Sequence, residues 1–423
     1  MAKIGRTTYK YFQKVFMKFF SKIKLVNIWE FNIYMLAMFP ILPKAAESIL
    51  MILFFIASIA CFSKKENKRI SRKQIHSIVA VSALFIIYLL GFFYTNNLSK
   101  NLEFVIRVAP LFMFALSFGY LCYQQKFNIK LLKCIYITTL IISILYVHFF
   151  LMKTLDAGVS NWEYRKAFEA FTQVHGTYFS LWIGFALILL VDKLFNYSFS
   201  LDKKKIVLML FAIIYLFFWQ FKIGARLPLA TTIFLCLVLL ILKASPTIKK
   251  ILVFGIPTTL FLVLFFNYKI ILDKTKFSLP KGKYELKHKV MTSEEIRAGI
   301  YYCSINLIKG SPFLGYSVGD VNKRLNACYL KEIDSDVYQT FNYNSHNQYL
   351  QSFLAGGIFC FLFFVLSILF LIKKAIYNRN KIMFFLLILL TTCFLTENIL
   401  SRHDGVIFYG FFINIFAFQK NKK

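Results

Sequence analysis

Long runs of apolar residues recur along the chain and are separated by short, mostly basic polar segments. A helix of about 20 apolar residues crosses the hydrocarbon core of a bilayer. The runs therefore predict an all-α integral membrane protein with about twelve transmembrane helices. The expected spans are 28–42, 45–62, 75–94, 102–123, 131–152, 173–194, 206–222, 227–243, 251–272, 348–372, 382–399 and 403–418.

One polar stretch, residues 273–347, is much longer than the other connections. It contains helix-like pieces, because Ser293 can cap a helix whose apolar residues recur at helical spacing to Leu307, and Gly310 can end it. The chain then divides into five regions. They are a basic N-terminal segment (1–26), nine spans (27–272), the loop with short helices (273–347), three spans (348–418) and a basic tail (419–423).

Composition and charge narrow the class of protein. Hydrophobic residues make up 58% and charged residues 17% of the 423 residues, which excludes an ordinary soluble enzyme. A net charge of +32 could indicate a nucleic-acid partner. However, seven short segments between the apolar runs hold 30 of the 51 Lys and Arg, so the charge does not form a patch on a folded domain. Under the positive-inside rule these segments are cytoplasmic and contact membrane lipids. Residues 1–26 and 419–423 are then cytoplasmic, residues 273–347 are extracytoplasmic, and no nucleic-acid partner is expected.

Six of the eight cysteines lie in or beside apolar runs, whereas Cys303 and Cys328 lie in the long polar loop. On the outer side of the membrane these two would meet an oxidising compartment, where disulfides persist. The sequence permits a bond between them but does not decide it, because their geometry is not visible. No spacing of Cys and His indicates a metal site.

His346 is the first candidate for chemistry, since it lies where the long loop meets the span at 348–372. Histidine titrates near neutral pH and suits a general base, and Asn347 is among its polar neighbours. The alternative is an interfacial histidine that only hydrogen-bonds the loop. His148, His175 and His288 are expected to be structural or solvated.

Several arginines could bind an anionic group. Arg226 follows the small-residue turn Gly224-Ala225, and Arg297 lies on the predicted loop helix. A guanidinium binds phosphate oxygens well, although an arginine at a helix end also commonly snorkels to the interface. Arg107 lies in a span, one turn after Glu103, and could form an ion pair or face a hydrated cavity. Glu397 and Arg402 bracket the last outer turn, which is either a binding site or a hydrated turn.

The order of these motifs resembles the O-antigen ligase / O-antigen polymerase family of bacterial envelope glycosyltransferases. The resemblance covers roughly residues 205–415. It rests on Gly224-Ala225-Arg226, Arg297, Pro312-Phe313-Leu314-Gly315, His346-Asn347-Gln348-Tyr349-Leu350, Ala355-Gly356-Gly357, Thr396-Glu397, Arg402 and Gly405. Ala225 departs from the family pattern, which usually has Ser before the first arginine.

The resemblance implies a GT-C-type, inverting transferase that needs no metal and no other cofactor. Its donor would be a glycan on undecaprenyl diphosphate, and its acceptor a sugar hydroxyl of lipid A–core or of another lipid-linked glycan. His346 would be catalytic, and Arg226 and Arg297 would hold the diphosphate. Asn347, Glu397, Arg402 and Arg107 are further candidates for substrate binding. The active site would face the periplasm from the inner membrane.

Three functions remain open at this stage. An O-antigen ligase and a repeat-unit polymerase differ in their acceptor, which variable loops select, so the sequence does not separate them. A twelve-span secondary transporter is the alternative from another class. It is disfavoured because no internal repeat is evident and because the long loop follows the ninth span rather than the sixth.

Overall fold

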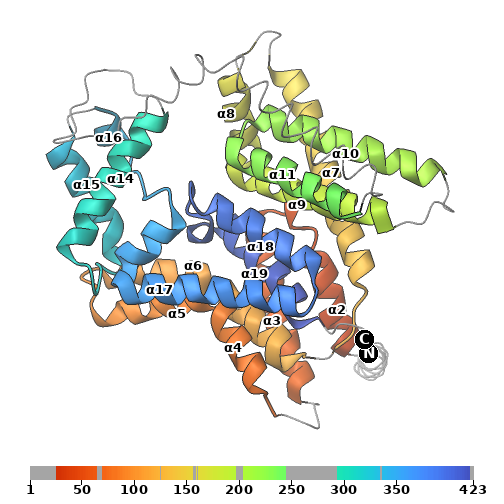
Figure 1. The fold of residues 1–423 in the computed structure, drawn as a ribbon, viewed down its shortest axis with the longest axis horizontal. Coiled ribbons are helices and arrows are strands. Elements are labelled where there is room, and N and C mark those ends of the chain that lie inside the picture. Colours follow the sequence, from red (N-terminus) through yellow and green to blue (C-terminus); the bar gives the residue numbers. More distant parts are fainter. Residues whose placement is uncertain are drawn as a thin grey trace, which may run out of the picture.

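The computed structural model describes residues 25–63, 69–123, 125–155, 159, 161–196, 203–243, 293–333 and 336–419. Within these ranges every regular element is a helix (Figure 1). The predicted span at 251–272, the loop residues 273–292 and nearly all of the N-terminal segment 1–26 lie outside the described residues, as do residues 420–423 of the tail.

Seven described helices are long and apolar enough to cross a membrane. They are α3 (Lys44–Ser63), α6 (Leu98–Leu116, continued by the π-helix Ser117–Leu121), α7 (Ile129–Thr154), α9 (Gly176–Asn196), α10 (Lys203–Ile223), α11 (Arg226–Lys243) and α17 (Gln348–Tyr377). An eighth span is formed if α4 (Arg72–Val81) and α5 (Ala83–Leu90), which are bent by 67° at Ser82, count as one. The chain is therefore a multi-pass, all-helical protein, and the number twelve stays a prediction.

Three predicted spans correspond to shorter helices. These are α2 (Leu25–Leu36), α18 (Lys381–Cys393) and α19 (His403–Phe418). The run predicted to end at residue 42 stops being α-helical at Leu36, and the 3-10 turn Phe39–Ile41 follows, because Pro40 and Pro43 cannot continue an α-helix. The run predicted to end at residue 399 stops at Cys393, and the next carbonyl, of Phe394, accepts the backbone NH of Gln348, the first residue of α17.

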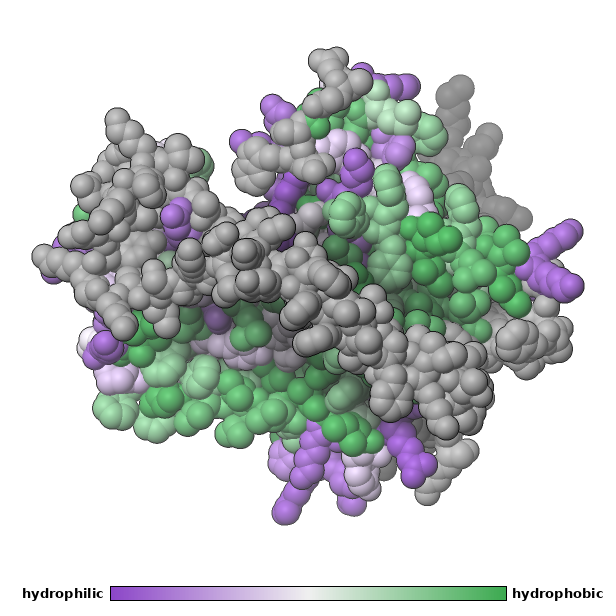
Figure 2. All heavy atoms as spheres, turned by 45° about the horizontal axis from the view of Figure 1, so that its top comes forward, coloured by the Kyte–Doolittle hydropathy of each residue, from purple (hydrophilic) through white to green (hydrophobic). Residues whose placement is uncertain are grey.

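The helix α19 lies at the centre of the bundle. All its residues from Asp404 to Ala417 are buried, as expected of a helix that is apolar on every side. Phe408, Phe412 and Phe416 pack their rings against Phe185 of α9. The outward faces are apolar too, as on α10 and α17, and Figure 2 shows a broad hydrophobic surface with hydrophilic side chains gathered mainly at its margins. This pattern fits a surface covered by lipid.

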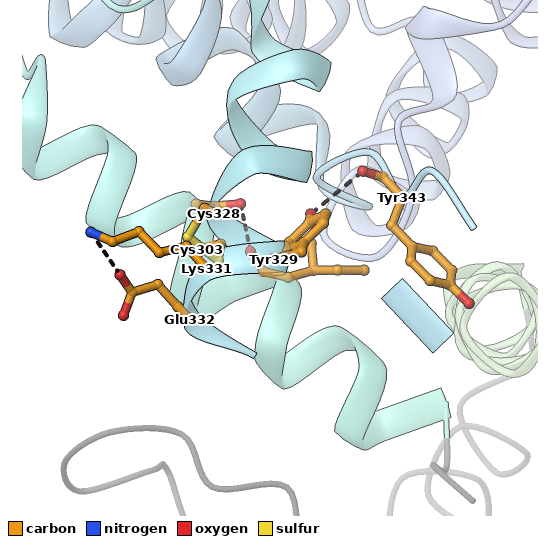
Figure 3. Close-up of a disulfide and its surroundings, with 8 residues drawn as sticks. Cys303, Cys328, Tyr329, Lys331, Glu332 and Tyr343 are labelled. Atoms are coloured by element: carbon orange, nitrogen blue, oxygen red, sulfur yellow. Dashed lines mark hydrogen bonds and ion pairs between the residues drawn. A yellow bond between two sulfur atoms is a disulfide. The ribbon is translucent and has the colours of Figure 1, made fainter. Parts of the chain in front are cut away.

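The part of the 273–347 loop that the structure describes contains three helices. They are α14 (Ser293–Gly310), α15 (Val318–Glu332) and α16 (Asp336–Thr340). The predicted loop helix is thus confirmed, one turn longer than expected. A disulfide joins Cys303 of α14 to Cys328 of α15, with 5.8 Å between the Cα atoms, and Tyr329 donates a hydrogen bond to the carbonyl oxygen of Tyr343 (Figure 3). The disulfide therefore ties α14 and α15 into a pair of helices.

A break in α17 holds this helix pair against the bundle. Gly356 and Gly357 leave the helical conformation, and Gly357 has φ = +66°. The segment before α15 fills the break: the backbone NH groups of Tyr316 and Ser317 donate to the carbonyls of Leu354 and Ala355, and that of Ile358 donates to Pro312. The Pro-x-x-Gly motif thereby satisfies backbone groups that the broken helix leaves open.

The other side of the helix pair docks on the turn between α5 and α6. Asp320 of α15 is buried and accepts hydrogen bonds from the Thr95 hydroxyl (3.0 Å) and the Asn96 backbone NH (2.8 Å). The Ser317 hydroxyl donates to the Asn101 side chain at 2.7 Å. The two attachments fix α14 and α15 over the end of the bundle at which α17 begins.

Candidate functional site

His346 lies in the turn that enters α17, in a backbone conformation that side chains rarely adopt. Its φ is +42°, in the left-handed region. The backbone NH of His346 donates to the Asn344 side chain at 2.9 Å. Asn347 then caps α17, because its side-chain oxygen accepts the NH groups of Tyr349 and Leu350. Such local strain persists only where the surroundings determine it, and it is common at functional sites.

Glu397 is the partner of the His346 ring. Its Oε2 lies 3.3 Å from Nδ1 of the imidazole. The Glu397 side chain is only 4% exposed, whereas that of His346 is 22% exposed. Among the residues that the structure describes, none hydrogen-bonds the other carboxylate oxygen, Oε1. The pair thus combines a buried carboxylate with a partly accessible imidazole and an open acceptor.

A buried polar network joins the two turns that carry this pair. The Ser345 hydroxyl donates to Gln351 at 2.9 Å, and the Asn398 amide donates to both Ser345 (3.0 Å) and Gln351 (3.2 Å). The Gln348 side chain accepts the backbone NH of Leu400 at 2.8 Å. The residues on either side of His346 are therefore fixed to those on either side of Glu397.

The charge on Glu397 is maintained by its neighbours. Burial raises the pKa of its carboxyl, but the hydrogen bond from His346 and the positive charges of His346, His175 and Arg402 outweigh burial and lower it to about 2. Glu397 is therefore a carboxylate at neutral pH. It accepts from Nδ1–H of His346, which leaves Nε2 as the basic nitrogen of the neutral ring.

Arg402 and Arg297 act electrostatically on Glu397 and on the neighbouring Tyr301, respectively. Arg402, exposed on the turn before α19, acts electrostatically on Glu397 and lies over the Tyr178 ring at 6.0 Å. Arg297 of α14 acts on Tyr301, whose hydroxyl donates to the Leu395 carbonyl at 3.2 Å. Burial raises the pKa of Tyr301, which also interacts with Asn347 and Glu397. The structure thus brings Arg297, Arg402, Glu397 and His346 to one side of the bundle.

Arg226 begins α11, directly after the turn at Gly224, which has φ = +68°. Arg226 itself is exposed. Ile223, before that turn, packs against Gly176, the first residue of α9. The preceding residue, His175, is electrostatically coupled to Glu397 and Arg402. The turn before Arg226 is thus linked to the start of α9 through Ile223 and Gly176.

Two of the predicted binding residues have protein partners. Arg107 pairs with Glu103, as the i,i+4 spacing indicated, and donates to the Ser401 carbonyl at 3.2 Å. Asn347 donates to the Leu395 carbonyl at 3.0 Å in addition to capping α17. Both side chains hold the backbone of the turn at 394–402 in place, which is a positioning role.

The sequence did not identify the residues that support the pair. His175 was expected to be structural; burial lowers its pKa, and Glu169 and Glu397 oppose that effect. Glu169 of α8 (Asn161–Thr172) accepts from Arg165 (2.9 Å) and from the Gly176 backbone NH (2.7 Å). The i,i+4 spacing of Arg165 and Glu169 on a helix was the one sequence signal for this group.

Residues 170–365 match the family model described as O-antigen ligase. The matched region contains Arg226, Arg297 and His346, whereas Glu397 and Arg402 lie beyond it. No curated protein matches the chain. In broad terms the family comprises glycosyl-transfer enzymes of lipopolysaccharide biosynthesis that use a lipid-linked glycan and an acceptor. The match over residues 170–365, somewhat less than half of the chain, shows that this multi-pass membrane protein is similar to the O-antigen ligase family.

Proposed function

We propose that this protein is a ligase-type transferase, which moves a glycan from undecaprenyl diphosphate to a sugar hydroxyl of lipid A–core. The reaction would take place on the periplasmic face of the bacterial inner membrane, without a metal. The observation that carries the proposal is the His346–Glu397 pair, 3.3 Å apart, within a chain whose residues 170–365 match the O-antigen ligase family.

The transfer requires a base, and His346 can supply it. The acceptor hydroxyl gives its proton to Nε2 of His346 while its oxygen forms a bond to the anomeric carbon of the donor sugar. The bond from that carbon to the diphosphate oxygen breaks, and undecaprenyl diphosphate leaves with the electron pair. Attack opposite the leaving group inverts the anomeric centre. Glu397 stabilises the imidazolium that forms and fixes the tautomer.

The arginines can stabilise the leaving group. As the donor bond breaks, negative charge grows on the diphosphate, and preorganised cations beside it lower the barrier. We assign this role to Arg402, which acts electrostatically on Glu397, to Arg297, which acts on the neighbouring Tyr301, and to Arg226 at the start of α11. Arg107 and Asn347 act indirectly, since they hold the turn that carries Glu397 and Arg402. The α14–α15 pair would cover the bound substrates.

A deletion strain tests the proposal. If the protein is a ligase, loss of the chain leaves full-length glycan on undecaprenyl diphosphate and bare lipid A–core. Accumulation of single lipid-linked repeats would instead show a repeat-unit polymerase of the same fold. Complementation with wild type and with His346→Ala, at equal protein levels, links either outcome to the site. Normal lipopolysaccharide in the deletion strain would contradict both functions.

A further inference from the structure

A second polar site lies next to the His346–Glu397 site. The first residues of α9 and α19 lie between the two sites. A cavity of about 480 Å³ is bordered by the turn before α3, by α7, by the end of α8, by α9 and by Asp404 of α19. Arg402 acts electrostatically on Glu397 of the first site, whereas the next two residues belong to the cavity side, since His403 contacts Glu47 and Asp404 lines the cavity.

Charged groups line one end of this cavity. His403 Nε2 lies 3.0 Å from Oε2 of Glu47, which makes a second histidine–carboxylate pair. Lys44 donates to the Gln173 carbonyl at 2.8 Å and lies 3.5 Å from Asp404. Glu47 and Asp404 are 3% and 5% exposed, so both carboxylates are buried against the cavity. The proposed mechanism uses none of these groups.

Two buried polar side chains that line the cavity lack hydrogen bonds. In the part of the chain that the structure describes, Asp404 has only the long ion pair with Lys44 and no hydrogen-bond donor. Ser143, in the middle of α7, is 8% exposed and its hydroxyl makes no hydrogen bond there. Neither the Asp404 oxygens nor the Ser143 hydroxyl belongs to the fully buried polar atoms that lack a partner, so these atoms are accessible from the cavity they line. A carboxylate and a hydroxyl placed in this way can hydrogen-bond a ligand that offers hydroxyl groups.

The rest of the wall is apolar and rich in aromatic residues. Phe39, Tyr146, Phe171, Phe179 and Trp182 line it. An anion would be repelled by Glu47 and Asp404, and a cation would compete with Lys44, which already pairs with Asp404. A lipid tail would leave Ser143 and Asp404 unsatisfied. A neutral sugar ring presents hydroxyls to the polar end and an apolar face to the aromatic rings.

We propose that this cavity is a subsite for a neutral sugar unit of a glycan substrate, held away from the diphosphate. Asp404 would accept from its hydroxyls, and Ser143 would donate to or accept from another. The inference rests on the proposed function, because only a glycan-transferring protein would meet such a sugar here. Either the donor glycan or the acceptor glycan could supply the unit.

The test is binding by the full-length protein in lipid nanodiscs, measured by saturation-transfer NMR and titration. Two probes separate the sources: the neutral oligosaccharide released by mild acid from the host's undecaprenyl diphosphate, and the oligosaccharide released from lipid A–core. Neither carries the lipid diphosphate that the arginines would bind. We expect one of them to bind, with Ser143→Ala about 3- to 10-fold weaker and Asp404→Asn at least about 10-fold weaker.

Thr139→Val is the matched control, since Thr139 lies one turn before Ser143 on α7, bonds only to carbonyls of its own helix and does not line the cavity. Ser143→Ala should fold normally because it removes no hydrogen bond, so the test stands even if Asp404→Asn does not fold. Equal binding by wild type and Ser143→Ala, or binding of neither probe by a protein that still transfers glycan, would overturn the subsite alone. Binding that persists without any transfer would overturn the proposed function and leave the subsite in place.

Discussion

Nδ1 of His346 lies 3.3 Å from Oε2 of Glu397, although 51 positions separate the two residues in the sequence. The contact depends on two turns that are fixed to each other by Ser345, Gln351 and Asn398. Under the proposed function, this contact would orient the partly exposed imidazole of His346 as a base.

Replacing His346 tests the base directly. We expect His346→Ala to lower glycan transfer by about 10²- to 10⁴-fold, the usual effect of losing a positioned base, while the protein inserts and accumulates normally. The measurement is glycan on the acceptor in a complementation assay at equal protein levels. His76→Ala, on the exposed side of α4, is the control and should be near wild type. Full activity of His346→Ala would make the histidine a loop anchor.

Replacing Glu397 tests orientation and charge through the pH dependence. The pKa of Glu397 is lowered from 4.5 to about 2. Its ionised carboxylate therefore stabilises the folded state above about pH 4.5, and this contribution is lost only as the pH falls toward 2. Glu397 therefore stays ionised across the working range. Glu397→Gln removes the anion that favours the imidazolium, so the acid limb of the pH–rate profile should move to lower pH. The maximal rate should fall by about 10²-fold or more.

A merely structural Glu397 would lower activity at every pH without moving that limb. Glu397→Asp, which keeps the charge, should restore the wild-type position of the limb at a reduced rate.

The transfer activity should depend on the planar shape of the arginine side chains as well as on their charge. We expect Arg297→Ala and Arg402→Ala each to reduce transfer by about 10- to 100-fold, and the Lys variants to recover only part of it, because a point charge replaces a planar fork. Steady-state kinetics with the lipid-linked donor measures the effect. Arg324→Ala on exposed α15, where the guanidinium lies over Tyr316, serves as the control. Full recovery by lysine at both positions would show that only net charge matters.

The sequence correctly predicted the structural features that depend on local patterns of residues. Long apolar runs revealed the main spans, and Ser293, Leu307 and Gly310 revealed the loop helix. It identified Glu397 and His346 separately but could not pair them, since nothing local records a contact across 51 positions. The end of α18 at Cys393 and the break in α17 were missed for the same reason, since the backbone at both places hydrogen-bonds to residues distant in the sequence.

The break in α17 provides a stability test. A Cβ at Gly357 would collide with the Phe313 carbonyl, and the residue has φ = +66°. Gly224 also has a positive φ, +68°, but among the described residues no atom lies within 4 Å of a Cβ added there. Gly224→Ala should therefore cost about 1–2 kcal/mol from its backbone alone, and Gly357→Ala clearly more. Thermal unfolding in detergent compares the two, and equal losses would show that the Phe313 carbonyl moves aside freely.

The disulfide between Cys303 and Cys328 should be present in the protein from native membranes and should stabilise the helix pair over the site. Because the cysteines are 25 positions apart in the sequence, loss of the bond is expected to cost about 3 kcal/mol, so Cys303→Ser should unfold at lower temperature. Thiol trapping without reductant should label neither sulfur in wild type and should label Cys328 in Cys303→Ser. Cys134→Ser, which changes an exposed free cysteine of α7, is the control and should leave stability unchanged.

Because disulfides persist in oxidising compartments, the bond also supports a periplasmic position for α14 and α15. Two free sulfurs in active protein would remove both the bond and this support for the topology.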